Sequence, residues 1–139
     1  MSLKKCLQAG QLKNVTPDLA LAKKSLLRGK NILNEVKKLQ KQNFIEVSEQ
    51  RLYQAYFHMF KALLYKDGVK ERSHYCTILY VKEKYQPKLN SYVEIIEILK
   101  DLRNQSQYGV EEVYREEEEI KNWLQDAHAL SHLIEEQLS

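Results

Sequence analysis

The sequence predicts an all-α protein, an antiparallel (up-down) four-helix bundle with one additional short helix. Glycine and proline are scarce, with 4 and 2 in 139 residues, which leaves little of the punctuation that many short strands need. Apolar residues recur at helical spacing over four long stretches, and no stretch reads as a strand. The length fits one domain, and 43% hydrophobic with 29% charged residues is ordinary for a globular chain.

The first long helix is expected to begin near Thr16. Thr16 can cap it, Pro17 suits its first turn because the missing N–H needs no partner there, and Asp18 favours the positive end of the helix dipole. Gly29 weakens the helix locally and permits close approach of a neighbour. The apolar face comprises Leu19, Ala22, Leu26, Leu33, Val36 and Leu39.

The second long helix is expected to open with a capping box, Asn43 and Glu46, and to stop at the turn Asp67-Gly68. It is apolar on most of its circumference, so we expect it to lie at the centre of the bundle. Its two apolar rows are Leu52, Ala55, Met59, Leu63 and Tyr53, Phe57, Phe60, Leu64.

Three helices follow. Ser73 is expected to cap a short helix that runs to about Tyr85 and is ended by Pro87. Ser91 with Glu94 forms a second capping box, which opens the stretch "YVEIIEILKDLRN". The last helix comes after Gly109 and carries Val113, Ile120, Leu124, Ala127, Ile134 and Leu138 on one side.

The net charge of +3 is too small to identify a nucleic-acid-binding protein, but the charge is unevenly distributed. Basic residues gather within the first 41 positions, and acidic residues gather in "EEVYREEEE". Solvated helix faces account for both runs. The alternative is a basic face that meets RNA or an acidic partner surface.

Residues 1–14 are expected to be a flexible N-terminal segment or one that is partly of artificial origin, and residues 15–139 are expected to form the bundle. The N-terminus lacks the apolar region of a signal peptide, and no stretch approaches the roughly 18 consecutive apolar residues of a spanning helix. Cys6 and Cys76 form neither a CxxC pair nor a disulfide framework. We therefore expect a cytoplasmic protein that does not bind a membrane.

The histidines give no strong metal motif. His128 and His132 lie one turn apart, but this spacing alone lacks the glutamate and the third ligand of a zinc motif, so we interpret both as surface residues. His58 stands among aromatic residues and is interpreted as partly buried. Cys76 makes a poor catalytic pair with His74, because neighbouring helix positions point in different directions. No metal or cofactor is expected.

The nine tyrosines are an unusual feature of the composition. Their amphipathic side chains suit the edges of a core, subunit interfaces and the stacking of bases alike. Core edge and interface are the interpretation that we favour.

The fourth long stretch ends in "DLRNQSQYG", residues 101–109. Arg103 is a cation in the last helical turn, where the dipole favours it, and Gly109 is the glycine that follows. Arg103 and Tyr108 are five residues apart, hence about 140° apart around a continuous helix. They converge only if the helix ends between them or if a second subunit brings its own copy.

The chain contains "YQAYFHMFKALLYKDGVKERSHY", "LRNQSQYG" and "VYREEEEIKNWLQDAHALSHLIEEQL". Together these stretches resemble the HEPN superfamily (higher eukaryotes and prokaryotes nucleotide-binding domain) over about Asp18 to Leu138. Many members are metal-independent ribonucleases, often toxins paired with a nucleotidyltransferase, with two Arg…His motifs meeting at a symmetric dimer interface. In such a site, arginine stabilises the charge that develops on the phosphate and histidine moves the proton of a 2′-OH.

Tyr108 stands about where the nuclease histidine would fall. A tyrosine with an ordinary pKa near 10 is a poor general base at neutral pH. The Arg-x4-Tyr arrangement is closer to a branch of the superfamily that resembles a non-nuclease, binding or scaffolding group.

The resemblance therefore implies a homodimer that binds a nucleotide, RNA or a nucleotidyltransferase-type partner in a toxin–antitoxin or defence-type module, without strong catalysis. The candidate binding residues are Lys70, Arg72, His74, Arg103, Asn104 and Tyr108, and any catalysis is assigned to Arg103 and Tyr108. One alternative is a metal-independent RNase that uses Arg103 at the dimer interface, with Asn104, Tyr108 or His74 as polar helpers. Another is a helical adaptor whose tyrosines and acidic last helix serve a protein interface.

Overall fold

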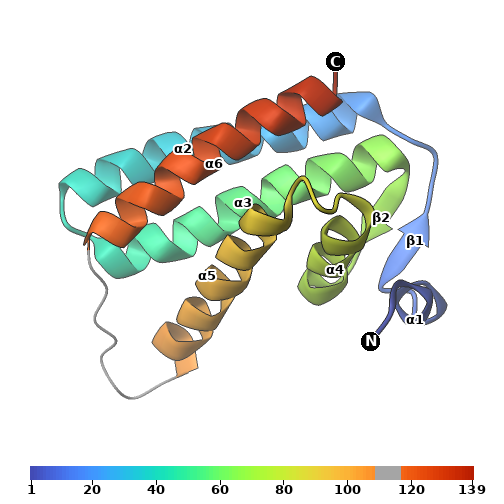
Figure 1. Ribbon diagram of the computed structural model, residues 1–139, viewed down its shortest axis with the longest axis horizontal. Coiled ribbons are helices and arrows are strands. Elements are labelled where there is room, and N and C mark those ends of the chain that lie inside the picture. The colour runs from blue at the N-terminus through green and yellow to red at the C-terminus, as the bar shows by residue number, and fades with distance from the viewer. Residues whose placement is uncertain (109–116) are drawn as a thin grey trace.

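A computed structural model describes residues 1–108 and 117–139 of the chain, with the side chains of 106–108 left out. Helices dominate this part of the chain, and the all-α prediction is confirmed (Figure 1). In chain order the elements are α1 (Leu3–Gln8), β1 (Leu12–Asn14), α2 (Leu19–Lys41), α3 (Ile45–Asp67), β2 (Val69–Glu71), α4 (His74–Lys84), α5 (Asn90–Tyr108) and α6 (Glu117–Gln137). Gly109 and Val113 lie outside the described residues.

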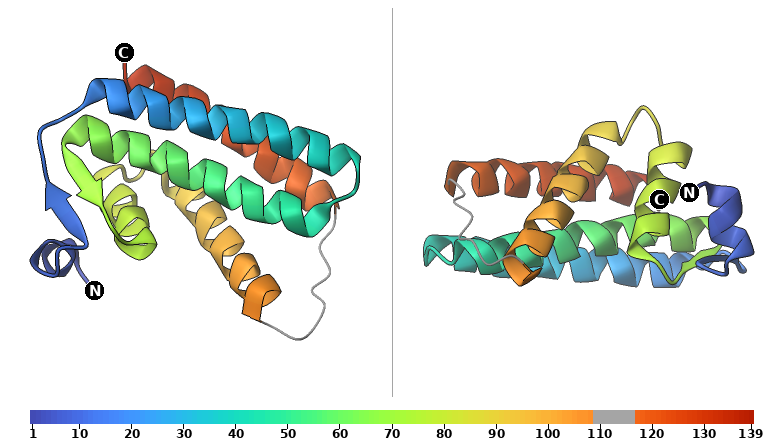
Figure 2. Two further views of the ribbon diagram at one scale, coloured as in Figure 1. Left: turned by 180° about the vertical axis from the view of Figure 1, so that it is seen from behind. Right: turned by 90° about the horizontal axis from the view of Figure 1, so that it is seen from below.

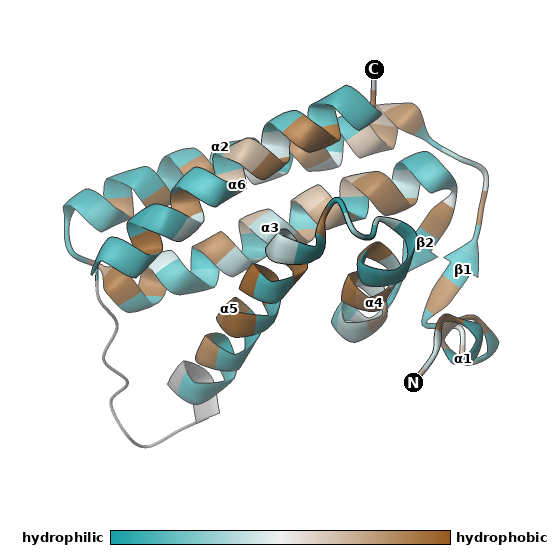
Figure 3. Cartoon of the chain, viewed as in Figure 1, coloured by the Kyte–Doolittle hydropathy of each residue, from teal (hydrophilic) through white to brown (hydrophobic). Residues whose placement is uncertain are grey.

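The bundle is built around α3, as its apolar circumference predicts. Helices α2, α3 and α6 run side by side, and α5 crosses α3 at an incline (Figures 1 and 2). Helix α4 lies near the C-terminal end of α3. Helix α3 contacts all four of the other helices in the bundle. Figure 3 shows hydrophobic bands at helical intervals along mainly hydrophilic ribbons, which is the pattern of helices with one buried face.

Gly29 sets the spacing between α2 and α3. A Cβ atom at this position would lie 2.7 Å from Cγ of Met59 and 3.1 Å from the backbone oxygen of Ala55. Both distances are shorter than an ordinary carbon contact. The expectation that Gly29 permits the close approach of a neighbour is thereby confirmed.

Two helix boundaries agree with the sequence. The Ser73 side chain caps α4 by accepting a hydrogen bond from the N–H of Cys76 at 3.1 Å. Gly68 ends α3 in the left-handed conformation, with φ of 80°, which glycine adopts without steric cost. The turn predicted at Asp67-Gly68 is confirmed.

Other helix starts differ from the predictions. Asp18, and not Thr16, caps α2 by accepting a hydrogen bond from the N–H of Leu21 at 2.9 Å. Asn43 does not open α3, because its N–H donates to the carbonyl of Gln40 and its φ is 62°. It therefore belongs to the end of α2, where asparagine tolerates the left-handed conformation. Helix α5 begins at Asn90, so Ser91 lies inside it, and both predicted capping boxes are wrong.

Residues 1–14, where a flexible segment was expected, hold α1 and β1. Strand β1 pairs with β2 antiparallel, with Lys13 opposite Lys70. The sequence did not predict these strands, and three residues are too few to show a strand pattern. A disulfide joins Cys6 of α1 to Cys76 of α4. The expectation that the cysteines form no disulfide is wrong, because the fold brings together residues separated by 70 positions.

Candidate functional site

The site lies where α4 and α5 meet one stripe of α3. Tyr53, Phe57 and Lys61 are spaced four residues apart on α3, so their side chains lie on the same face of the helix. Tyr53 is 1% exposed and Phe57 is 8% exposed. His74, the first residue of α4, and Arg103, on α5, both lie against this stripe. We call these five residues the aromatic–cation cluster.

The imidazole of His74 contacts two aromatic rings that also contact each other. It is stacked on Phe57, with ring centroids 4.0 Å apart at 28°, and its Nδ1 lies 2.9 Å from the hydroxyl oxygen of Tyr53. The tautomer decides whether the hydroxyl or Nδ1 donates this hydrogen bond. Nε2 is then a donor in the first case and an acceptor in the second. Tyr53 thereby fixes the orientation of the ring.

The pKa of His74 is lowered from its ordinary value. Partial burial is the largest cause, followed by the positive charges of Arg103 and Lys100, while the negative charge of Glu71 acts in the opposite direction. Burial and neighbouring cations both disfavour the imidazolium form. At neutral pH the ring is therefore predominantly neutral, which is the form that can accept a proton.

Arg103 rests on an aromatic face. Its guanidinium carbon lies 5.3 Å from the centroid of the Tyr53 ring, which is cation–π distance. Burial raises the pKa of the Tyr53 hydroxyl, and the charge and hydrogen bonding of Arg103 act against that rise. No ion pair joins Arg103 to a carboxylate of the described residues. The positive charge of the half-buried guanidinium is thus not neutralised by this part of the chain.

Lys61 and Glu71 neutralise each other at the β2 side of the site. Nζ of Lys61 lies 3.0 Å from Oε1 of Glu71, and the hydroxyl of Tyr65 donates to the same oxygen at 3.1 Å. Burial lowers the pKa of Lys61, but the hydrogen bond and charge of Glu71 outweigh it, and the net shift is upward. This pair attaches β2 to α3. Among the described residues, Arg103 and Lys100 then remain as the cations near His74 that no carboxylate pairs with.

The other predicted site residues are arranged more loosely. Lys70, Arg72 and Asn104 are exposed, and their side chains have no ion pair or hydrogen bond among the described residues. Lys70 lies on β2 directly opposite Lys13. The side chain of Tyr108 lies outside the described part. Because α5 continues through Tyr108, the backbone positions of Arg103 and Tyr108 lie about 140° apart around one helix.

Three residues of the cluster were not expected from the sequence to serve a site. Tyr53 and Phe57 were interpreted as core residues, which their burial confirms. Lys61 is one of many lysines in the sequence and belongs to no motif. The available signal was the four-residue spacing of two rings and a cation, which places all three on one helix face.

A metal site finds no support in the part of the chain that is described. No three His, Cys, Asp or Glu side chains there are grouped so as to hold a metal ion. His128 and His132 are exposed. His58 is half-buried, and burial followed by the charge of Lys61 lowers its pKa. Among the described helices, none is long and apolar enough to cross a membrane.

Comparison with known proteins gives one match. The family model described as HEPN domain matches residues 22–137, a range that contains the whole aromatic–cation cluster. Searches of curated proteins and of solved structures each gave no match.

Proposed function

The chain belongs to the HEPN domain family, whose function is nucleotide- or RNA-related in general, and we propose that it binds RNA through phosphate groups at Arg103 and His74. One observation carries the proposal. Arg103 lies on the Tyr53 ring, and no carboxylate among the described residues forms an ion pair with it. The same tyrosine orients His74. A fixed and unneutralised guanidinium is the side chain best suited to bind phosphate oxygens with two hydrogen bonds.

Further basic residues extend the positive surface beyond Arg103. Lys100 lies one turn before Arg103 on α5, and its charge acts on His74. Lys13 and Lys70 are directly opposite each other on the two strands. Like charges in such a pair repel, so an anion between them relieves a cost that the free protein bears. Several phosphates of an RNA strand are needed to satisfy these cations together.

Cleavage of RNA is the second candidate function, and the position of His74 favours it. In the proposed reaction the neutral imidazole takes the proton of a 2′-OH, whose oxygen attacks the adjacent phosphorus. The bond to the 5′ oxygen breaks and that oxygen takes a proton from water, which gives a 2′,3′-cyclic phosphate and a 5′-hydroxyl end. The imidazolium returns its proton to the solvent. Arg103 stabilises the charge on the phosphate oxygens. His74, with its lowered pKa, suits the base role better than Tyr108, whose residue type has an ordinary pKa near 10.

A homodimer and a nucleotidyltransferase-type partner in a toxin–antitoxin or defence-type module remain part of the proposal. The dimer is supported by α5, which is continuous through Tyr108. Arg103 and Tyr108 of one chain therefore diverge, and a second copy is the remaining way to bring the two residue types together. Light scattering of the purified protein tests the dimer. Co-purification with a tagged nucleotidyltransferase from the same genome tests the partner.

The binding proposal is tested with a labelled single-stranded RNA and three proteins: wild type, Arg103→Ala and Arg28→Ala. Arg28 is exposed on α2 and serves as the matched control, because its loss removes the same charge elsewhere. Only Arg103→Ala is expected to weaken binding, by roughly tenfold or more for a charge-assisted contact, and to reduce the salt dependence by about one phosphate contact. Equal affinities for the two variants contradict the site assignment.

The cleavage proposal needs a separate measurement. Wild type and His74→Gln are incubated with the RNA in the presence of a chelator, since the reaction uses no metal ion. Glutamine can still donate a hydrogen bond to a phosphate oxygen but cannot act as a base. Cleavage to cyclic phosphate ends that wild type shows and His74→Gln has lost, while binding persists, therefore supports the second function. Intact RNA after long exposure to wild type rejects it. Absence of any RNA or nucleotide binding by wild type rejects the leading proposal and favours the helical adaptor.

A further inference from the structure

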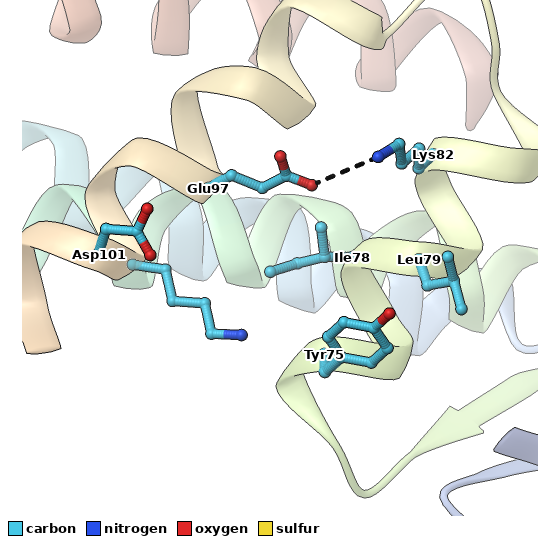
Figure 4. Close-up of a pocket in the computed structure, with 7 residues that line it drawn as sticks. Tyr75, Ile78, Leu79, Lys82, Glu97 and Asp101 are labelled. Atoms are coloured by element: carbon cyan, nitrogen blue, oxygen red, sulfur yellow. Dashed lines mark ion pairs between the residues drawn. The ribbon is translucent and has the colours of Figure 1, made fainter. Parts of the chain in front are cut away.

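A cavity of about 250 Å³ opens between α4 and α5. Side chains of α4 line one wall and side chains of α5 line the other (Figure 4). The α4 wall is mainly apolar and the α5 wall is charged. The lining residues are Tyr75, Ile78, Leu79, Lys82, Glu97, Lys100 and Asp101. We call this space the α4–α5 cavity.

The α4–α5 cavity adjoins the proposed phosphate site. Tyr75 directly follows His74 on α4, and Lys100 lies one turn before Arg103 on α5. Lys100 connects the two places, because its ammonium lies 5.5 Å from the centroid of the Tyr75 ring and its charge also acts on His74. A nucleotide whose phosphate contacts Arg103 therefore has its base within reach of the cavity.

We propose that the α4–α5 cavity is a nucleobase subsite that selects guanine in single-stranded RNA. The inference rests on the proposed RNA binding and adds the identity of the base. The volume is below the roughly 300–1,000 Å³ of pockets for drug-sized ligands, and it suits a single planar ring system. Proteins that read single-stranded RNA stack unstacked bases on aromatic side chains and hydrogen-bond their edges.

Tyr75 supplies the stacking surface. Its side chain is 47% exposed although it is a large aromatic residue, and Ile78 and Leu79 continue the apolar wall. In the free protein Lys100 lies over the ring of Tyr75. A cation–π contact at an exposed site is weaker than the stacking of a base on an aromatic ring. A base therefore displaces Lys100, and the freed ammonium is available to the phosphate beside Arg103.

Asp101 supplies the selection. No ion pair or side-chain hydrogen bond of its carboxylate is found among the described residues, whereas the neighbouring acid Glu97 is paired with Lys82 at 3.8 Å. A carboxylate only accepts hydrogen bonds. Guanine offers two adjacent donors on its Watson–Crick edge, the ring N1–H and the 2-amino group. Adenine and cytosine place a ring-nitrogen acceptor beside their amino group, and uracil flanks its N–H with two carbonyls, so each presents a lone pair to the carboxylate.

The test uses fluorescently labelled heptamers of 2′-O-methyl RNA, which cannot be cut by attack of a 2′-OH. Each heptamer is all uridine except for one central guanosine, adenosine, cytidine or inosine, and the strand is free to slide until that base reaches the cavity. Inosine keeps the N1–H but lacks the 2-amino group. We expect wild type to bind the guanosine strand roughly tenfold more tightly than the adenosine strand, with inosine between them.

Four variants separate the contributions. Asp101→Asn is expected to abolish the preference for guanosine and to leave adenosine binding within about twofold. Tyr75→Leu is expected to weaken the binding of all strands by roughly tenfold, and Tyr75→Phe to retain it, because the ring is kept. Glu94→Gln, an exposed position on α5 that does not line the cavity, is the matched control and is expected to behave as wild type. Circular dichroism melting confirms that each variant is folded.

The outcomes distinguish the two proposals. If no strand binds wild type, the proposed function fails and the subsite fails with it. If all strands bind equally and Arg103→Ala weakens them, RNA binding holds and the guanine subsite is wrong. A preference for guanosine that survives Asp101→Asn also overturns the subsite, because the selecting carboxylate is then elsewhere.

Discussion

The disulfide between Cys6 and Cys76 is expected to contribute a large share of the stability. It joins residues separated by 70 positions, so it restricts the unfolded chain over a long loop. The chain-entropy relation for a loop of this length gives roughly 4.4 kcal/mol at 25 °C, which lies near the upper end of the measured range of about 0–5 kcal/mol. Against a total of about 5–15 kcal/mol for a domain, its loss is expected to lower the melting temperature by on the order of 10 °C.

Urea unfolding of the oxidised protein, the reduced protein and the Cys6→Ser/Cys76→Ser variant measures this contribution. The reduced protein and the double variant are expected to unfold at the same urea concentration, which is lower than that of the oxidised protein. The double variant is the control for side effects of the reductant, because it contains no disulfide to reduce. Mass spectrometry after thiol alkylation without reductant establishes whether the bond is present. Alkylation of both cysteines under these conditions, or equal unfolding free energies with and without reductant, would falsify the reasoning.

Three further predictions concern packing and titration. Gly29→Ala is expected to destabilise the protein by about 1 kcal/mol, because overpacking against Met59 costs about 1–3 kcal/mol and the helical preference of alanine returns about 1. A double-mutant cycle with Met59→Ala tests the contact. If the double variant loses as much unfolding free energy as the two single variants together, Gly29→Ala does not act through Met59. Arg103→Ala is expected to raise the pKa of His74, measured by NMR titration, because the charge of Arg103 lowers that pKa. The pKa of His58, which the charge of Arg103 does not shift, is expected to stay unchanged. If the pKa of His74 does not change in this variant, the charge of Arg103 does not act on His74 and the prediction is wrong. Because the folded state lowers the pKa of His58 and His74, the unfolded state binds more protons, and stability is expected to fall as the pH drops from about 7.5 through 6.5. A urea midpoint that is higher at pH 5.5 than at pH 7.5 contradicts this prediction.

The long helices could be predicted because their signal is periodic. Apolar residues at helical spacing located α2, α3, α5 and α6, and the glycine at position 68 located the end of α3. Capping was predicted less well. Asn43 and Asp18 are both residues that cap helices, and only the three-dimensional path of the chain decides which helix end each one serves. A capping motif read from the sequence does not contain that path.

The N-terminal elements depend on distant contacts. Strand β1 exists because it pairs with β2 more than fifty positions later in the chain, and α1 is tied to α4 by the disulfide. Three-residue strands have too few side chains to show alternation, and two isolated cysteines show no pairing pattern. Neither feature has a local sequence signal.

The candidate site could likewise be predicted only in part. Arg103 and His74 were selected from the sequence as polar residues at the boundaries of helices, but their proximity was not evident. They meet through Tyr53, which the sequence could only assign to the core. The ring of Tyr53 packs in the core, while its hydroxyl and its outer face contact the residues of the candidate site. In the sequence, such a residue has the same apolar spacing as an ordinary core residue. Only the packing of α4 and α5 on α3 reveals its second role.

The aromatic support of Arg103 has a consequence for how the protein behaves at different ionic strengths. A guanidinium held by a carboxylate loses its support as salt screens the pair, whereas one resting on a largely desolvated ring keeps its position. Under the proposed RNA binding, salt is therefore expected to release the nucleic acid without disordering the residues that held it. The protein should carry nucleic acid through a low-salt purification, seen as excess absorbance at 260 nm, and emerge from a high-salt wash folded, empty and ready to rebind.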